Sequence, residues 1–447
     1  MENERQIILE TLLAFEKKEQ TLDSLIRAVL SKYTYLDRNK RSFINRVTKG
    51  SIERYYELDH IIGQFSKTPV NKLRPVIHNI LLMSIYQMKY MDHVPVSAIC
   101  NEAVKLTEKK GFKSLKAYVN GVLRNISRNL PAVRYPDRKE DLRSYLKIKY
   151  SCGEYIIDLL LEQYGEDICE RILEDSLKER PICIRCNLSK GSMEDLKSSL
   201  SKDNISFKTD KRVKDALYLE NYDLLENISA FKEGRFNVQD MGSILVTKAS
   251  AIKEGDKVID VCAAPGGKTC HAADILKGSG QVLARDISDK KVSYIKDNVA
   301  RCGFKNIRTK VWDARVDDEE LYEKFDVVIA DLPCSGLGVM ARRVDLKYRI
   351  DKEAVDALVS LQRNILTSVC KYVKKGGCLI FSTCTVNKLE NIENLYWIRE
   401  NLPLASEAIE GEEFLNFNKD SLSEGYLQLL PGIDNSDGFF ISRFKRI

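Results

Sequence analysis

The stretch KVIDVCAAPGGKTCHAADIL, residues 257–276, decides how the second half of the chain is built. An apolar run is followed at once by a glycine-containing loop and then by a segment with the apolar spacing of a helix. Gly266 and Gly267 leave unshielded backbone amides at the helix start, where a ligand can bind. The glycine spacing is not that of a dinucleotide site, and Cys262 stands where a P-loop has its first glycine. The stretch therefore predicts a cofactor loop of another kind.

Further apolar runs follow this loop, with helical or loop segments between them. They are QVLARDI (281–287), IRTKVWD (307–313), FDVVIADL (325–332) and GCLIFSTC (377–384). Strands that alternate with helices in this way are typical of a mostly parallel, doubly wound sheet, whose ligands bind at the carboxyl ends of the strands. We predict an α/β Rossmann-like catalytic domain over residues 236–447.

The first half of the chain has a different organisation. Residues 1–130 carry apolar side chains at three- and four-residue intervals, as in IILETLLAF and VIHNILLMSIYQM, which predicts an all-α domain, and Asp37 is placed to cap one of its helices. The charged, proline-containing segment 131–141 is predicted to be a linker. Residues 142–235 mix helical patterns with strand-like runs (ICIRCNL, ALYLE and ISAF), which predicts a small α+β domain.

The composition limits the classes of function. A chain of 447 residues with 30% charged residues and no apolar run near ~20 residues is expected to be a cytoplasmic protein that neither spans a membrane nor carries a secretion signal. The net charge of +6 permits a polyanionic partner. Twelve cysteines in that compartment argue against disulfides. We predict no metal site, because the single C-x-x-C pair, Cys183 and Cys186, falls on opposite faces of a strand and is better explained by packing.

Carboxylates follow two of the predicted strands on one side of the cofactor loop. Asp286 ends the second strand, about where a carboxylate accepts hydrogen bonds from the ribose of a cofactor. Asp313 ends the third strand and is placed either to bind an adenine edge or to cap the next helix. Together they indicate a cofactor that contains ribose.

Two thiols and a carboxylate follow the other two strands. The fourth strand ends in ADLPCSG and the fifth in STCT, so Asp331, Cys334 and Cys384 are expected to converge above the cofactor loop. A single cysteine in a strand-rich core is ordinarily a packing residue, but the position after a strand favours a chemical role here. Spacing alone does not say which thiol is the nucleophile, and the proline before Cys334 favours that residue.

With these motifs, the sequence resembles the bacterial 16S ribosomal RNA cytosine-5 methyltransferases of the RsmB, Sun or Fmu type. The resemblance covers essentially the full length and is carried by VIDVCAAPGGKT, DLPCSG and STCT with Glu390 and Asn391. FNVQDMGS (236–243), RRVDLKYR (342–349) and DGFFISRF (437–444) match the expected surroundings. DHVPVSAICNEAV (92–104) and AYVNGVLRNI (117–126) resemble the antitermination factor NusB.

The resemblance implies a role for each matched residue. S-adenosylmethionine would be held by Asp286, Asp313, Asp331 and the loop Cys262, Ala263, Ala264, Pro265, Gly266, Gly267 and Lys268. Cys384 would be the nucleophile, and Cys334 would act later, in release of the methylated RNA. The implied reaction is methylation of carbon 5 of one cytosine in 16S ribosomal RNA, by resemblance cytosine 967, through a covalent bond from cysteine to carbon 6.

The chemistry explains why such an enzyme needs these groups. Carbon 5 of cytosine is a poor nucleophile, and addition of a thiolate to carbon 6 activates it. Asp331 could donate a proton toward ring N3 if burial keeps its carboxyl group protonated. Arg342, Arg343, Lys347 and Arg349 are placed to meet RNA phosphates, although a solvated charged turn explains them about as well.

The protein is expected to act as a monomer, and two rival functions stay open. One is methylation of another RNA, such as transfer RNA, because the motifs barely separate the substrates. The other is an RNA-binding or antitermination module without catalysis.

Overall fold

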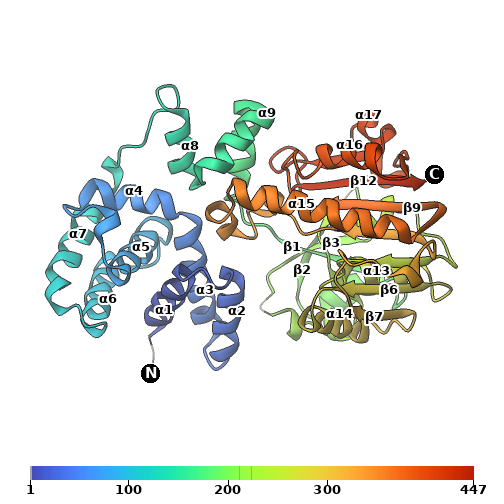
Figure 1. The fold of residues 1–447 in the computed structure, drawn as a ribbon. Coiled ribbons are helices and arrows are strands. Elements are labelled where there is room, and N and C mark those ends of the chain that lie inside the picture. The colour runs from blue at the N-terminus through green and yellow to red at the C-terminus, as the bar shows by residue number, and fades with distance from the viewer. Residues whose placement is uncertain (1–2, 211, 223) are drawn as a thin grey trace. The chain divides into compact units, whose positions relative to one another are not determined.

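The chain forms two compact units in the computed structural model, which describes residues 3–210, 212–222 and 224–447 (Figure 1). The helical unit contains the residues up to Lys178 together with Met340–Ile350. The sheet unit contains Glu179–Val339 and Asp351–Ile447. The chain therefore leaves the sheet unit after Val339 and returns to it at Asp351.

The helical unit is all-α, as predicted, and its helices enclose one apolar core. Helix α3 begins after Asp37, whose side chain accepts a hydrogen bond from the amide of Lys40 at 2.9 Å, so the predicted N-cap is confirmed. The helices and 3-10 turns are α1 (Glu4–Glu16), α2 (Leu22–Lys32), α3 (Arg38–Glu53), α4 (Tyr55–Phe65), η1 (Val70–Lys72), α5 (Pro75–Tyr90), α6 (Val96–Lys109), η2 (Lys113–Leu115), α7 (Lys116–Asn129), η3 (Leu130–Ala132), α8 (Leu142–Tyr150), α9 (Glu154–Asp175) and η7 (Val344–Tyr348).

Two segments of the helical unit come from outside residues 1–130. Helices α8 and α9, which we assigned to the small α+β domain, group with the other helices. Segment 340–350, which lies between the last two strands predicted from sequence, packs Val344 and Tyr348 against the helical core. The amide of Gly153 donates to the carbonyl oxygen of Lys347 at 3.0 Å. The helical unit thus includes a short segment, Met340–Ile350, whose flanking residues on both sides belong to the sheet unit.

The sheet unit begins with a small antiparallel sheet of strand order β2-β3-β1-β4. Two of the three strand-like runs form strands, but ISAF forms a helical turn, because its apolar residues Ile228 and Ala230 are buried beside Phe236 while the backbone closes short-range hydrogen bonds. The elements are β1 (Ile182–Cys186), α10 (Met193–Lys202), β2 (Ser206–Thr209), β3 (Ala216–Glu220), η4 (Leu225–Asn227), α11 (Ser229–Lys232) and β4 (Phe236–Val238).

The large sheet has the order β10-β12-β9-β8-β5-β6-β7, with β11 paired to β12. All five strands predicted from sequence form, and they run parallel to their neighbours among themselves, while β12 is antiparallel to β9. The strands are β5 (Lys257–Asp260), β6 (Gln281–Asp286), β7 (Ile307–Val311), β8 (Phe325–Asp331), β9 (Val373–Thr383), β10 (Leu404–Ser406), β11 (Tyr426–Leu429) and β12 (Phe439–Arg446). The chain order reverses between β5 and β8, which is the switch point where ligands bind in such sheets.

Helices cover both faces of the large sheet, because its strands are apolar on both sides. Val258 and Ile329 pack with α12 and α13, whereas Ile259 and Val328 pack with α15 and α16. The helices and turns are α12 (Met241–Ala249), α13 (Gly267–Ile275), α14 (Asp289–Cys302), η5 (Glu319–Leu321), η6 (Leu337–Val339), α15 (Lys352–Val369), η8 (Cys370–Tyr372), α16 (Ile392–Asn401), η9 (Glu412–Phe414) and α17 (Lys419–Ser423). The predicted Rossmann-like core is confirmed.

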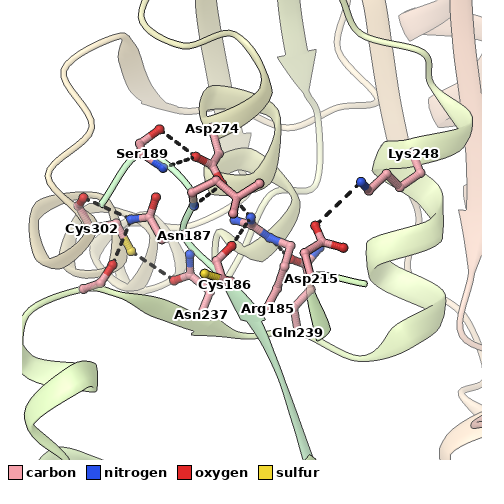
Figure 2. Close-up of polar contacts among 12 residues, drawn as sticks. Arg185, Cys186, Asn187, Ser189, Asp215, Asn237, Gln239, Lys248, Asp274 and Cys302 are labelled. Atoms are coloured by element: carbon pink, nitrogen blue, oxygen red, sulfur yellow. Dashed lines mark hydrogen bonds and ion pairs between the residues drawn. The ribbon is translucent and has the colours of Figure 1, made fainter. Parts of the chain in front are cut away.

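A buried ion pair joins the small sheet to helix α13, as Figure 2 shows. Arg185 on β1 donates to Asp274 on α13 at 2.7 Å, and the amides of Leu188 and Ser189 donate to the same carboxylate. Asp274 lies in the helix that begins at the glycine loop. The small sheet is therefore fastened to the helix that would carry the cofactor.

The C-x-x-C pair has the packing role that we predicted. Cys183 is buried with Ala216 and Met241, whereas Cys186 is buried with Leu196 and Phe236 in a different apolar cluster. The two thiols thus occupy opposite faces of β1. Within the described ranges, no helix has the length and hydropathy of a membrane span.

Candidate active site

The glycine loop has the shape expected of a cofactor site. Gly266 adopts a left-handed conformation with φ of +107°, and a side chain there would press on Ile295 of α14 at 3.4 Å. Helix α13 starts at Gly267, and the preceding glycine has no side chain that could cap the helix. The free amides and the positive end of the helix dipole suit a carboxylate or another anion.

Two buried carboxylates flank this loop. Asp286 accepts hydrogen bonds from the amide of Ala264 at 2.9 Å and from that of Ile287 at 2.8 Å. Asp260, at the end of β5, accepts from the hydroxyl of Thr269 at 2.7 Å, and its other oxygen has no hydrogen-bond partner among the described residues. Oxygen acceptors beside a free helix start fit a cofactor with hydroxyl, ammonium and carboxylate groups, as S-adenosylmethionine has.

The other predicted cofactor residues are also near the ends of the parallel strands. Cys262 packs beside the apolar layer under α15, so its thiol serves packing. Asp313 follows β7 and forms a two-point contact with Arg315, whose hydrogen bonds hold the pKa of Asp313 below its usual range. A cofactor would have to share Asp313 with that arginine.

The two predicted catalytic thiols lie together. Strands β8 and β9 are parallel neighbours in a register that pairs Asp331 with Ser382, so Cys334 and Cys384 leave the sheet side by side. Their sulfur atoms are 3.4 Å apart, and both residues are partly exposed. A single small molecule or base placed above them could contact both sulfurs.

Asp331 connects the thiols to the glycine loop. The ammonium of Lys268 lies 2.6 Å from its carboxylate, and the hydroxyl of Ser382 donates to it at 2.8 Å. Burial lowers the pKa of Lys268, but the contacts with Asp331 outweigh that effect and leave the pKa raised. The predicted protonated form of Asp331 depends on apolar neighbours, whereas this carboxyl group faces the ammonium of Lys268 and the hydroxyl of Ser382.

The surroundings of Cys334 hold a proton on its sulfur. Its hydrogen bond with Cys384, desolvation and the negative charges of Glu390 and Asp331 raise the pKa of Cys334 well above the usual thiol value. Cys334 therefore keeps its proton in the resting site. Its thiol can serve as a hydrogen-bond donor to the Cys384 sulfur 3.4 Å away.

The predicted RNA-contact residues belong to segment 340–350 of the helical unit. Lys347 is fully buried there and its ammonium donates to the carbonyl oxygen of Tyr150 at 3.3 Å, so it has no surface to offer a phosphate. Arg343 is exposed, and Arg342 is partly exposed. Arg349 lies 3.6 Å from Asp345 and also donates to the carbonyl oxygen of Gln20.

Asp260 is an acidic residue of the site that was not singled out from sequence, and the signal for it was an acid at the end of the otherwise apolar run KVIDV. Glu390 was named with the second cysteine motif, but no role was predicted for it. It stands in a helix-like, polar segment whose pattern gives no sign that the carboxylate is buried.

The fold and the site define a methyltransferase with a Rossmann-like core, a glycine-loop cofactor site and a pair of thiols. The protein-family model described as 16S rRNA methyltransferase RsmB/F matches residues 248–445. The NusB family model matches residues 2–128, and the model of an RsmF/B-like ferredoxin-like domain matches residues 153–223. A probable ribosomal RNA small subunit methyltransferase B of Bacillus subtilis is 31% identical over 99% of this chain and 98% of the relative. A similarly named protein of Synechocystis is 28% identical over 99% of each chain. The chain belongs to the ribosomal RNA small subunit methyltransferase B family.

Solved structures share the fold. The crystal structure of PH0851 superposes with a TM-score of 0.82 over 100% of this chain and 99% of that one, at 23% identity. NSun6 from Pyrococcus horikoshii with SFG superposes with a TM-score of 0.58 over 66% of this chain and 98% of that one, at 20% identity.

Proposed function

We propose that this protein transfers a methyl group from S-adenosylmethionine to carbon 5 of one cytosine in 16S ribosomal RNA, by resemblance cytosine 967, through a covalent bond between Cys384 and carbon 6. The observation that carries the proposal is the 3.4 Å separation of the Cys334 and Cys384 sulfurs. That pair lies at the edge of the sheet that also holds the glycine loop. The names of the relatives and the SFG bound to a structural neighbour support the substrate and the cofactor.

The reaction would begin with the addition of Cys384 to the ring. The Cys384 thiolate forms a bond with carbon 6, and the electron pair of the 5,6 double bond makes carbon 5 nucleophilic. S-adenosylmethionine, when bound, supplies the electrophilic methyl group. The Cys334 thiol lies 3.4 Å from the Cys384 sulfur and can donate a hydrogen bond to the thiolate that starts the reaction.

Cys334 would then act in the release step. Once Cys384 has bonded to carbon 6 it no longer carries charge, and the chief cause of the raised pKa of Cys334 disappears. Cys334 can then lose its proton to water and take the proton from carbon 5. The 5,6 double bond forms again and the Cys384 thiolate leaves, which frees the methylated RNA.

Asp331 would select cytosine over uracil. Its side-chain oxygens accept hydrogen bonds from Lys268 and Ser382, and they can accept another from a base. Cytosine has an amino group at position 4 that can donate to such an acceptor, whereas uracil has a carbonyl oxygen that would be repelled. A target inside a duplex would have to be extruded from the base stack.

Bisulfite mapping of ribosomal RNA tests the proposal. RNA from cells with and without this protein is compared, together with isolated small-subunit RNA and transfer RNA methylated in vitro. The proposal predicts one protected cytosine in 16S ribosomal RNA that disappears without the protein. Protection of transfer RNA alone would favour the first rival function, and absence of any protected cytosine would favour a non-catalytic RNA-binding module.

A further inference from the structure

Glu390 places a carboxyl side chain in the interior beside the Cys334 loop. The residue is 0% exposed and lies between β9 and α16. Its carboxylate accepts hydrogen bonds from the amide of Ser335 at 2.8 Å, from Gln362 at 3.0 Å and from Asn387 at 3.1 Å, and the Ser335 hydroxyl donates to it as well. These four donors are neutral. Burying a carboxyl group costs free energy that its hydrogen bonds must offset, so its presence beside the cysteine loops indicates a use beyond packing.

The donors belong to the loops that carry the thiols. Ser335 directly follows Cys334, and Gln362 of α15 also donates to the carbonyl oxygen of Pro333, the residue before Cys334, at 2.9 Å. The Ser335 hydroxyl is 2.7 Å from that of Thr385, which directly follows Cys384. Asn387 lies in the same loop as Cys384. One carboxylate is therefore connected to both cysteine loops.

We propose that Glu390 is a positioning residue that clamps the Cys334 loop against the Cys384 loop, so that both sulfurs face one pyrimidine ring. This inference rests on the two-thiol function proposed above. Glu390 acts through Ser335 and does not touch the substrate. Its negative charge also contributes to keeping the proton on Cys334 until Cys384 has reacted.

The isosteric change Glu390→Gln tests the clamp. A carboxylate accepts all four hydrogen bonds, whereas an amide directs its own two N–H donors at some of the same partners. A displacement of reacting atoms by about 1 Å costs on the order of 100-fold in rate, so we expect kcat to fall at least ~10-fold. The KM for S-adenosylmethionine should stay within about 2-fold, because Glu390 is not part of the glycine loop.

Disulfide formation measures the clamp without RNA or cofactor. Diamide, a diazene oxidant, takes two electrons and two protons from the thiols as one S–S bond forms and two S–H bonds break. Sulfurs 3.4 Å apart need little movement to reach the ~2.05 Å of a disulfide. Peptide mass mapping follows the Cys334–Cys384 disulfide, and we expect it to form at least ~10-fold more slowly in Glu390→Gln than in the unchanged protein.

Asp274→Asn is the matched control, because Asp274 is also a buried carboxylate with several donors but is bonded to the small sheet (Figure 2). It should lower the melting temperature and leave the rate of disulfide formation unchanged. Thr385→Val removes the hydroxyl that contacts Ser335 and also accepts from the amide of Asn387. It should slow disulfide formation to a smaller extent, and this variant carries the test if Glu390→Gln does not fold.

The outcomes separate the clamp from the proposed function. Disulfide formation at the unchanged rate in Glu390→Gln, or in Thr385→Val where the first variant does not fold, would overturn the clamp. Slow disulfide formation in a protein that methylates no cytosine would leave the clamp standing and contradict the proposed function instead.

Discussion

Asp260 is a carboxylic acid in a nearly water-free position. It is 1% exposed at the end of β5, and burial, partly offset by the Thr269 hydrogen bond, raises its pKa to about 7. In the unfolded chain its pKa is near 3.8. Between these values the folded state holds a proton that the unfolded state has lost, so this group makes the protein less stable as pH rises from about 4 to 7.

Asp260→Asn should remove that pH dependence. Asparagine stays neutral and its amide oxygen can still accept from Thr269, so we expect the cofactor-free variant to be more stable than the unchanged protein by about 2–4 kcal/mol above pH 7. Urea unfolding between pH 4 and 8 measures the difference. A variant with the same slope against pH as the unchanged protein would contradict the assignment.

The candidate site residues that the structure brings to one edge of the sheet share one property: each ends or follows an apolar strand. Asp286, Asp331, Cys334 and Cys384 could be predicted to converge because the carboxyl ends of parallel strands meet at one edge. Their polar partners could not be predicted in the same way. Apolar neighbours were expected around Asp331, and the structure puts the ammonium of Lys268 against it instead.

At the scale of elements, three segments approach one another closely behind the thiols. The amide of Gly338 in η6 donates to the carbonyl oxygen of Cys384 at 3.1 Å, and the amide of Gly438 donates to that of Gly338 at 2.8 Å. A methyl group on Gly338 would lie 2.2 Å from the Gly438 oxygen and 2.8 Å from the Cys384 oxygen. Only glycine fits between these two backbones.

Gly338→Ala should therefore separate the Cys334 and Cys384 loops. We expect a loss of roughly 1–3 kcal/mol in stability from overpacking and at least a ~10-fold fall in kcat, measured by methyl transfer to RNA. Gly121→Ala in α7 is the control, because no atom lies within 4 Å of the added carbon. Equal activity of the two variants would show that the approach of the loops is unimportant.

The strands and the layers of the sheet unit follow from local pattern, but the path of segment 340–350 does not. RRVDLKYR is read from sequence as a charged surface turn, because four of its eight residues are basic. In the structure Val344 packs in the helical core and Lys347 is fully buried. The burial of Val344 and Lys347 results from long-range packing against α3 and α8, which the local sequence pattern does not indicate.

Lys347→Met should stabilise the helical unit. Burial lowers the pKa of Lys347 to about 8 from 10.5, so the charged form is penalised below pH 8 and stability rises as pH increases from 8 to 10.5. Methionine removes the charge, and we expect up to ~3 kcal/mol of added stability at pH 7. Thermal unfolding at pH 7 and pH 10 should show that this gain has nearly vanished at the higher pH, and an equal gain at both values would contradict the pKa assignment.

The whole molecule combines a NusB-like helical unit with a methyltransferase core. The two compact units do not have the boundaries of the four sequence ranges that we predicted, because the helical unit extends to Lys178 and also includes Met340–Ile350. The exposed Arg343 remains our proposed phosphate contact, and Arg342 and Arg349, in the same segment, are partly exposed. Such contacts release counterions from RNA when they form.

Arg343→Ala should weaken RNA binding and reduce the slope of log K against log salt by about 0.7–0.9. Filter binding at several salt concentrations measures the slope. Lys347→Met is the control, because a buried lysine meets no phosphate and should leave the slope unchanged. An unaltered slope in Arg343→Ala would favour a solvated charged turn.

In the proposed mechanism the two sulfurs have different roles on one cytosine. Cys384 forms the covalent bond to carbon 6, and Cys334 is needed for the release of the methylated RNA. Denaturing electrophoresis of the protein after incubation with RNA and S-adenosylmethionine tests this most directly. The account predicts a protein–RNA adduct that survives denaturation for Cys334→Ala and none for Cys384→Ala. An adduct from Cys384→Ala, or none from Cys334→Ala while its cytosines are still methylated, would contradict it.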